Sequence, residues 1–166
     1  MNLYLTVALL LVLALVQSTV MSRVTVLGVH PDLMLMAVTS WSLLRGTQEG
    51  MRWALVGGVA LDLLSGARFG VSTLSLLIVS FLSSVGERNV FRFDLLVPLL
   101  AIPLATLLYN GAVLLLLRIL GWPTEWGTGL TRVVLPATLV NTLGMPIVYL
   151  VMRALDRRVG REEINW

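Results

Sequence analysis

Residues 95–120 decide the fold and read LLVPLLAIPLATLLYNGAVLLLLRIL. The single charge in this run is Arg118, close to its end. About 20 predominantly apolar residues are enough for one transmembrane helix, so this run predicts a long membrane span.

Five further apolar runs occur outside this one, and polar stretches at 45–52, 65–70, 86–94 and 121–132 separate the runs after the second. The second to fourth runs are short for a span, which predicts tilted, kinked or re-entrant helices sheltered by their neighbours. If the third and fourth runs form one re-entrant hairpin, five spans remain instead of six. The six runs are Leu3–Met21, Val29–Leu44, Trp53–Leu64, Val71–Ser84, Leu95–Leu120 and Val133–Met152.

The composition points the same way. Of the 166 residues, 57% are hydrophobic and only 13% are charged, about half the charged share of a soluble domain. This balance excludes a disordered chain, a nucleic-acid binder and almost any soluble enzyme. We therefore expect an all-α integral membrane protein: a six-transmembrane-helix bundle with short loops, forming a single transmembrane domain over 1–166 with a short charged cytoplasmic tail at 153–166. The first span lacks a preceding basic residue and a cleavage site, so we expect it to be retained.

Arginine supplies all twelve basic residues and predicts the orientation. Positive charge concentrates on the cytoplasmic side of membrane proteins. With six spans, eight arginines fall on the side of the two termini and four on the other, so both termini are expected in the cytoplasm. Trp41 and Trp53 would then lie at the inner interface, and Trp122 and Trp126 at the outer one. The eight are Arg45, Arg52, Arg88, Arg92, Arg153, Arg157, Arg158 and Arg161; the four are Arg23, Arg68, Arg118 and Arg132.

The reactive residues are few. Cysteine and lysine are absent, and His30 is the only histidine. Thiol chemistry, a lysine nucleophile and a multi-histidine metal site are therefore excluded. The sequence contains no nucleophile elbow, phosphate-binding loop or zinc-protease motif, and we expect no catalytic site, cofactor or metal.

Small residues recur every four positions from Gly46 to Gly70, with Asp62 among them. Small residues at this spacing let two membrane helices approach closely. A row at spacing four drifts around a helix, so only its central part, Gly50 to Gly58, is expected to be a packing ridge, and both ends are expected to be turns. The ridge serves either packing within the chain or contact with another protein.

Polar residues within the apolar runs are the other candidates. Asp62 is an acid inside an apolar run, and we interpret it as an anchor near the outer surface that fixes the 65–70 turn or pairs with Arg68; a proton or ion site is the alternative. Pro31 and Asp32 read as a helix start. Asn110 and Asn141 are expected to hydrogen-bond between helices.

Several of these residues together resemble the family of rod shape-determining MreD proteins. The resemblance rests on Pro31-Asp32-Leu33, Arg45-Gly46 with Glu49-Gly50, Gly57-Gly58 followed by Asp62 to Gly66, Gly70, and Asn141 followed by Pro146 and a basic tail. The candidate packing or partner-contact residues are accordingly Pro31, Asp32, Gly46, Glu49, Gly50, Gly57, Gly58, Asp62, Gly66, Gly70, Asn141 and Pro146.

The resemblance implies an architecture similar to the substrate-binding subunits of energy-coupling-factor transporters. It also implies a non-enzymatic role in the bacterial cell-elongation machinery of the inner membrane. The implied partners are MreC, the MreB filament system, the RodA glycosyltransferase and a class B penicillin-binding transpeptidase, besides membrane lipid and not nucleic acid. A homo-oligomer stays open.

Two other functions stay open. A substrate-binding subunit of a small-molecule transporter would use Asp62, Asn110 and Asn141 to line a midplane pocket. The first span has no small-x-x-x-small motif, which favours the elongation role. An intramembrane enzyme would need a nucleophile–base pair, and the sequence shows none.

Overall fold

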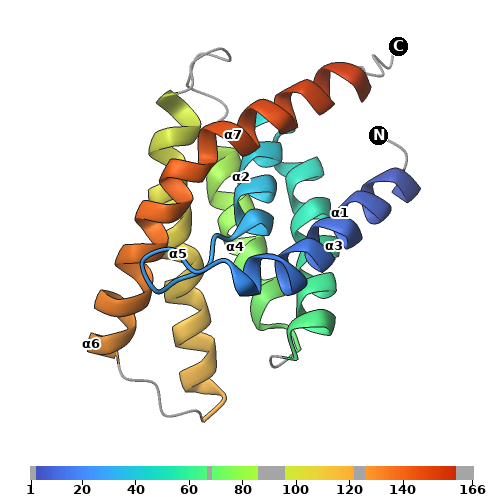
Figure 1. Cartoon of the computed structure of the whole chain (residues 1–166). Helices are drawn as coiled ribbons and strands as arrows, with labels where there is room; N and C mark the ends of the chain where they lie inside the picture. Colours follow the sequence, from blue (N-terminus) through green and yellow to red (C-terminus); the bar gives the residue numbers. More distant parts are fainter. Residues whose placement is uncertain (1–2, 67–68, 86–95, 122–125, 160–166) are drawn as a thin grey trace.

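The computed structural model describes residues 3–66, 69–85, 96–121 and 126–159, and this part of the chain is helical throughout apart from its connections (Figure 1). Six helices of thirteen residues or more make up the described bundle. They are α1 Leu3–Thr19, α2 Leu33–Arg45, α3 Thr47–Ser65, α4 Val71–Val85, α5 Leu96–Ile119 and α7 Leu135–Val159, with the shorter η1 Met21–Arg23, α6 Trp126–Gly129 and the π-helical η3 Leu130–Val134.

The prediction of an all-α membrane protein is confirmed. Three helical stretches in the described residues, Tyr4–Arg23, Leu96–Ile119 and Thr131–Val159, are long and apolar enough to cross a membrane. The 24 residues of α5 extend about 36 Å, more than the hydrocarbon thickness of about 30 Å. Helices α2 and α4 are shorter apolar helices.

Helix α2 is the centre of the bundle. Nine consecutive residues, Met34–Ser42, are buried, so this helix is covered on every side. It contacts α1, α3, α4, α5 and α7. A helix that is apolar all round belongs in a protein interior, and its neighbours shelter it as the sequence predicts.

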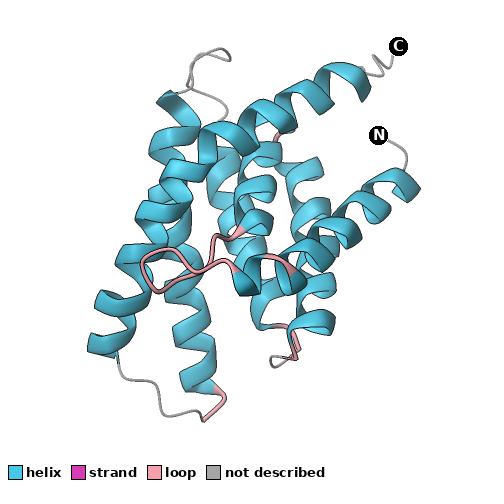
Figure 2. Cartoon of the chain, viewed as in Figure 1, coloured by secondary structure: helices cyan, strands magenta, loops and turns pink. Residues whose placement is uncertain are grey.

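The helices around α2 form two groups. Helices α3 and α4 run antiparallel as a hairpin with the most extensive contact in the described chain, while α5 and α7 lie side by side on the other flank (Figure 1). Figure 2 shows the segment between η1 and α2 as a loop. Val29 of this loop packs with Ala137 and Val140 of α7, so the loop closes one face of the bundle.

The predicted polar turn at 45–52 is wrong. Gly46 alone separates α2 from α3, and its φ of +81° is a conformation that side chains disfavour. Glu49 falls in the first turn of α3, where a negative charge suits the helix dipole, so the charged residues continue the helix instead of breaking it. Helix α3 therefore has 19 residues and is longer than the predicted Trp53–Leu64.

Trp41 and Trp53, which are predicted at the inner membrane interface, do not face the outside of the bundle. Both side chains are buried and their rings stack with centroids 4.2 Å apart at 13°. Stacked aromatic rings of this kind bury a large apolar area within a protein core. The side chains of Trp122 and Trp126 lie outside the described part of the chain.

Two boundaries near the C-terminus differ from prediction. The stretch 121–132, expected to be a loop, contains α6 and the start of η3. Helix α7 continues through the first residues of the predicted charged tail to Val159, because Arg157 and Arg158 complement the negative end of its dipole. Residues 160–166 lie outside the described structure.

Candidate functional site

The contact between α3 and α4 is built on small residues. A Cβ added at Gly58 would collide with the backbone Cα of Thr73 on α4. One added at Gly50 would collide with the Ser42 side chain of α2 and lie 2.8 Å from the Ser80 hydroxyl oxygen of α4. Ala54, between the two glycines, is fully buried. The central part of the four-residue ladder thus lies directly against a neighbouring helix.

Gly57, which is outside the ladder, and the glycines at the ends of the ladder have other positions. Gly57 faces α2, where an added Cβ would lie 2.7 Å from the sulfur of Met34. Gly46, Gly66 and Gly70 stand at helix ends and have φ of +81°, +63° and +97°, so each turn needs a residue without a side chain.

Asp62 of α3 caps the start of α4. Its Oδ1 accepts a hydrogen bond from the Ser72 amide at 3.0 Å. Its Oδ2 accepts bonds from the Gly70 amide at 2.9 Å, the Thr73 amide at 3.1 Å and the Thr73 hydroxyl at 2.6 Å. The first amides of a helix have no partner within the helix, and here a carboxylate from the preceding helix satisfies them.

The bonds of Asp62 can be compared with the anchor interpretation. The bond to the Gly70 amide ties Asp62 to the 65–70 turn, as the anchor interpretation requires. The proposed pairing with Arg68 concerns a residue outside the described structure. Ser72 and Thr73 were not predicted as partners of Asp62, although hydroxyl residues next to a Gly-containing turn are a usual signal for a helix start.

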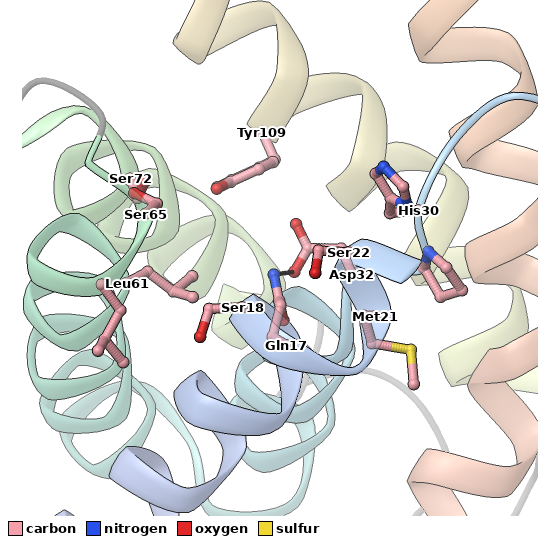
Figure 3. A pocket seen from close by; sticks show the side chains of 12 residues that line it. Gln17, Ser18, Met21, Ser22, His30, Asp32, Leu61, Ser65, Ser72 and Tyr109 are labelled. Carbon is pink, nitrogen blue, oxygen red and sulfur yellow. Dashed lines mark hydrogen bonds between the residues drawn. The ribbon is translucent and has the colours of Figure 1, made fainter. Parts of the chain in front are cut away.

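Asp32 caps its own helix. Its Oδ1 accepts from the Leu35 amide at 2.9 Å and from the Gln17 side-chain nitrogen at 2.9 Å (Figure 3). The Gln17 oxygen in turn accepts from the Met34 amide at 2.7 Å, so α1 is fastened to the start of α2. The predicted helix start is confirmed, with Pro31 just before the cap instead of in the first turn.

Asn141 connects three helices. Its Oδ1 accepts from the Asp32 amide at 3.0 Å, and its Nδ2 donates to the Thr106 hydroxyl of α5 at 3.3 Å. The expected bond between helices is thus present at Asn141. At Asn110 the expectation is wrong, because its nitrogen donates to the Thr106 carbonyl of its own helix. Pro146 lies inside α7.

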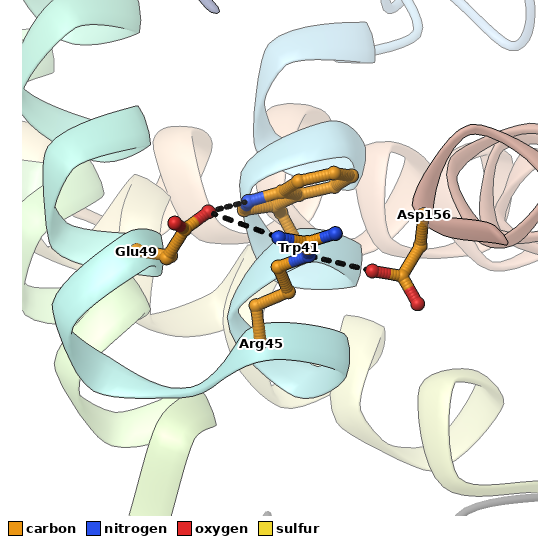
Figure 4. A network of polar contacts seen from close by, with 4 residues as sticks. All are labelled: Trp41, Arg45, Glu49 and Asp156. Atoms are coloured by element: carbon orange, nitrogen blue, oxygen red, sulfur yellow. Dashed lines mark hydrogen bonds and ion pairs between the residues drawn. The ribbon is translucent and has the colours of Figure 1, made fainter. Parts of the chain in front are cut away.

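A charged cluster joins α2, α3 and α7 (Figure 4). The Arg45 Nε donates to the Asp156 carboxylate at 2.6 Å, and its guanidinium lies 5.1 Å from the Trp41 ring centroid. Glu49 accepts from the Trp41 indole nitrogen at 3.1 Å and lies 4.0 Å from an Arg45 nitrogen. The sequence did not predict that Arg45 and Glu49 meet Asp156 in one cluster, because Asp156 is 111 residues away from Arg45.

The polar side chains of the bundle therefore serve as helix caps and interhelical contacts. The described residues include no group of three histidine, cysteine, aspartate or glutamate side chains able to hold a metal. The geometry fits a protein whose polar side chains fix its helices against one another.

Comparison with known proteins places the whole helical bundle in one family. The family described as rod shape-determining protein MreD matches residues 1–159. The chain belongs to the MreD family.

This match covers every helix from α1 to α7. Neither the curated proteins nor the solved structures contain a match to the chain. The likeness of MreD to the substrate-binding subunits of energy-coupling-factor transporters therefore stays a prediction from the sequence.

Proposed function

We propose that this MreD protein is a non-enzymatic component of the bacterial cell-elongation machinery that binds MreC and helps to position peptidoglycan synthesis. The family match over residues 1–159 carries this proposal, because it extends across the described helices and names rod-shape determination as the family's role. RodA, its penicillin-binding transpeptidase and the MreB filaments are the further partners of that machinery.

The proposal includes a location. The protein is a multi-pass protein of the inner membrane with both termini in the cytoplasm. The eight-to-four distribution of arginines supports this orientation, and so does the position of the Arg45–Asp156 pair, which joins the C-terminal end of α7 to the end of α2.

A partner within the membrane would contact this chain mainly through the exposed faces of its helices. The connection between α2 and α3 is one residue long, so little of the described chain projects beyond the helices there. Helices α5 and α7 present exposed leucines such as Leu100 and Leu143, exposed by 74% and 76%. Helix α3 presents Leu63, exposed by 69%, on the other flank of the bundle.

Site-specific photo-crosslinking in living cells tests the partner. A photoreactive phenylalanine analogue is placed at Leu63, Leu100 or Leu143 in turn, and crosslinked products are identified with an antibody against MreC. Because association of membrane helices depends on close packing over one face, we expect a crosslink to MreC from one flank and not from all three positions.

For each variant, crosslinking to MreC is compared with crosslinking to a bystander, an unrelated membrane protein with a matched tag. Equal crosslinking of the bystander from every position would mean random encounter in the bilayer. Absence of MreC from the products at all three positions would count against direct binding by these faces and against the proposal.

A further inference from the structure

A cavity of about 420 Å³ lies where several elements meet, at the turn end of the α3–α4 hairpin and away from the Arg45 cluster (Figure 3). The end of α1, the residues before α2, the end of α3, the start of α4 and Tyr109 of α5 surround it. Cavities of a few hundred Å³ are the size of small-molecule sites in proteins.

Asp32 gives the cavity its charge. The bonds from Gln17 and Leu35 both end on Oδ1, while Oδ2 faces the cavity in Figure 3. Gln17 uses its nitrogen for Asp32 and its oxygen for the Met34 amide, so it orients the carboxylate and is itself satisfied. No arginine or lysine occurs among the described residues that line the cavity.

The hydroxyl groups around Asp32 present acceptors. Ser18 donates to the Leu15 carbonyl and Ser22 to the Thr19 carbonyl, both within or next to α1. Their protons are therefore used, and their oxygen lone pairs remain for a donor in the cavity. The Tyr109 hydroxyl lies on the opposite side of the cavity and points toward Ser72 (Figure 3).

A cavity with one carboxylate and several acceptor oxygens fits a cation rich in N–H donors and disfavours an anion. We propose that it binds the primary ammonium group of an amphipathic molecule, with the nitrogen at Asp32 Oδ2. Charge-assisted hydrogen bonds of this kind are stronger than neutral ones. Met21, Leu61 and Leu64 line the rest of the cavity and take the apolar part of the molecule. This inference does not rest on the proposed function.

Native mass spectrometry of the full chain, purified in dodecylmaltoside, measures the binding. Dihexanoyl phosphatidylethanolamine is compared with dihexanoyl phosphatidylglycerol, which has the same chains and phosphate but no amine. We expect one phosphatidylethanolamine per chain, with an affinity at least tenfold above that for phosphatidylglycerol. Competition with free ethanolamine then distinguishes two sources of the ammonium group. Displacement of the lipid by ethanolamine would assign a small amine as the ligand, and retention of the lipid would assign a lipid headgroup.

Asp32→Asn tests the assigned contact. Asparagine caps a helix as well as aspartate, so the variant keeps the Leu35 bond and loses the charge. We expect phosphatidylethanolamine affinity to fall at least tenfold, while Tyr149→Phe, on α7 and outside the cavity, keeps the wild-type affinity. If Asp32→Asn does not fold, Leu64→Trp, which fills the cavity from α3, replaces it with the same expected loss. Equal binding of the two lipids, or unchanged binding in the substituted protein, would overturn the proposal.

Discussion

Asp62 Oδ2 accepts both the amide and the hydroxyl of Thr73, at 3.1 and 2.6 Å, across the contact between α3 and α4. One turn earlier on α3, Gly58 lies against the backbone of the same threonine. The close approach and the hydrogen bonds therefore depend on each other: without a glycine at 58, the carboxylate at 62 could not reach the start of α4.

Removing the charge of Asp62 is expected to destabilise the fold. In Asp62→Asn, one carboxylate oxygen becomes an NH₂ group that faces amide donors, so the free energy of unfolding should fall by about 1–3 kcal/mol. Thr73→Val removes only the hydroxyl bond and should cost about 1 kcal/mol. Unfolding in mixed micelles titrated with SDS measures both.

Ser83→Ala on α4 is the matched control, and a change within about 0.5 kcal/mol is expected for it. If Asp62→Asn folds as stably as the wild type but fails to support rod shape in cells, the anchor interpretation fails and a functional carboxylate becomes the better account.

A single methyl group at position 58 is expected to separate α3 from α4. Gly58→Ala forces a Cβ into the Thr73 backbone, which cannot move aside as a side chain can, and should lower the free energy of unfolding by about 1–3 kcal/mol despite the better helix propensity of alanine. Gly58→Leu should reduce the folded yield and the recovery of MreC together.

Gly111→Ala is the control for this prediction. Gly111 is also inside a helix, α5, but an added Cβ there meets nothing within 4 Å. Alanine should stabilise that site by about 0.5–1 kcal/mol. Similar effects of alanine at 58 and 111 would show that Gly58 is not a packing position.

The Arg45–Asp156 pair is expected to couple α2 to α7. Arg45→Lys loses the guanidinium nitrogen that reaches Asp156 and the planar contact with Trp41, so lysine should not substitute for it. A double-mutant cycle with Arg45→Gln and Asp156→Asn should give a coupling energy of about 1–2 kcal/mol, because this charged hydrogen bond is partly buried. A coupling energy near zero would mean that the pair is an exposed contact of little consequence.

The orientation is tested by reporter fusions. Alkaline phosphatase, which is active outside the cytoplasm, should be inactive when fused after Trp166 and active when inserted between Trp122 and Trp126, because the arginine distribution places the termini inside. Green fluorescent protein at the same two sites should give the opposite pattern. Phosphatase activity from the Trp166 fusion would refute the six-span topology.

The sequence predicted those features that depend on local pattern. Long apolar runs located α1, α5 and most of α7, since a span must be apolar along its whole length. Asp32 was recognisable as a helix start because a cap acts within three residues. The four-residue spacing of small residues located the α3 surface that lies against α4, although not which helix covers it.

The features that it did not predict depend on distant contacts or on a single backbone conformation. Arg45 and Asp156 meet only because α2 and α7 pack together. Trp41 and Trp53 stack because the reversal at Gly46 brings two helices into contact. The polar composition of 45–52 indicated a loop. The chain instead reverses at Gly46 alone, and the polar residues after it form the first turns of α3.

The most direct test of the central claim is where new cell wall is made when this protein is depleted. Fluorescent D-amino acids label new peptidoglycan in cells in which the chain is replaced by an inducible copy. Our account predicts that depletion makes rods become round, that labelling loses its distribution along the side wall, and that wild-type protein restores both while Gly58→Leu does not. Depleted cells that stay rod-shaped with unchanged side-wall labelling would contradict the claim that this MreD protein helps to position peptidoglycan synthesis.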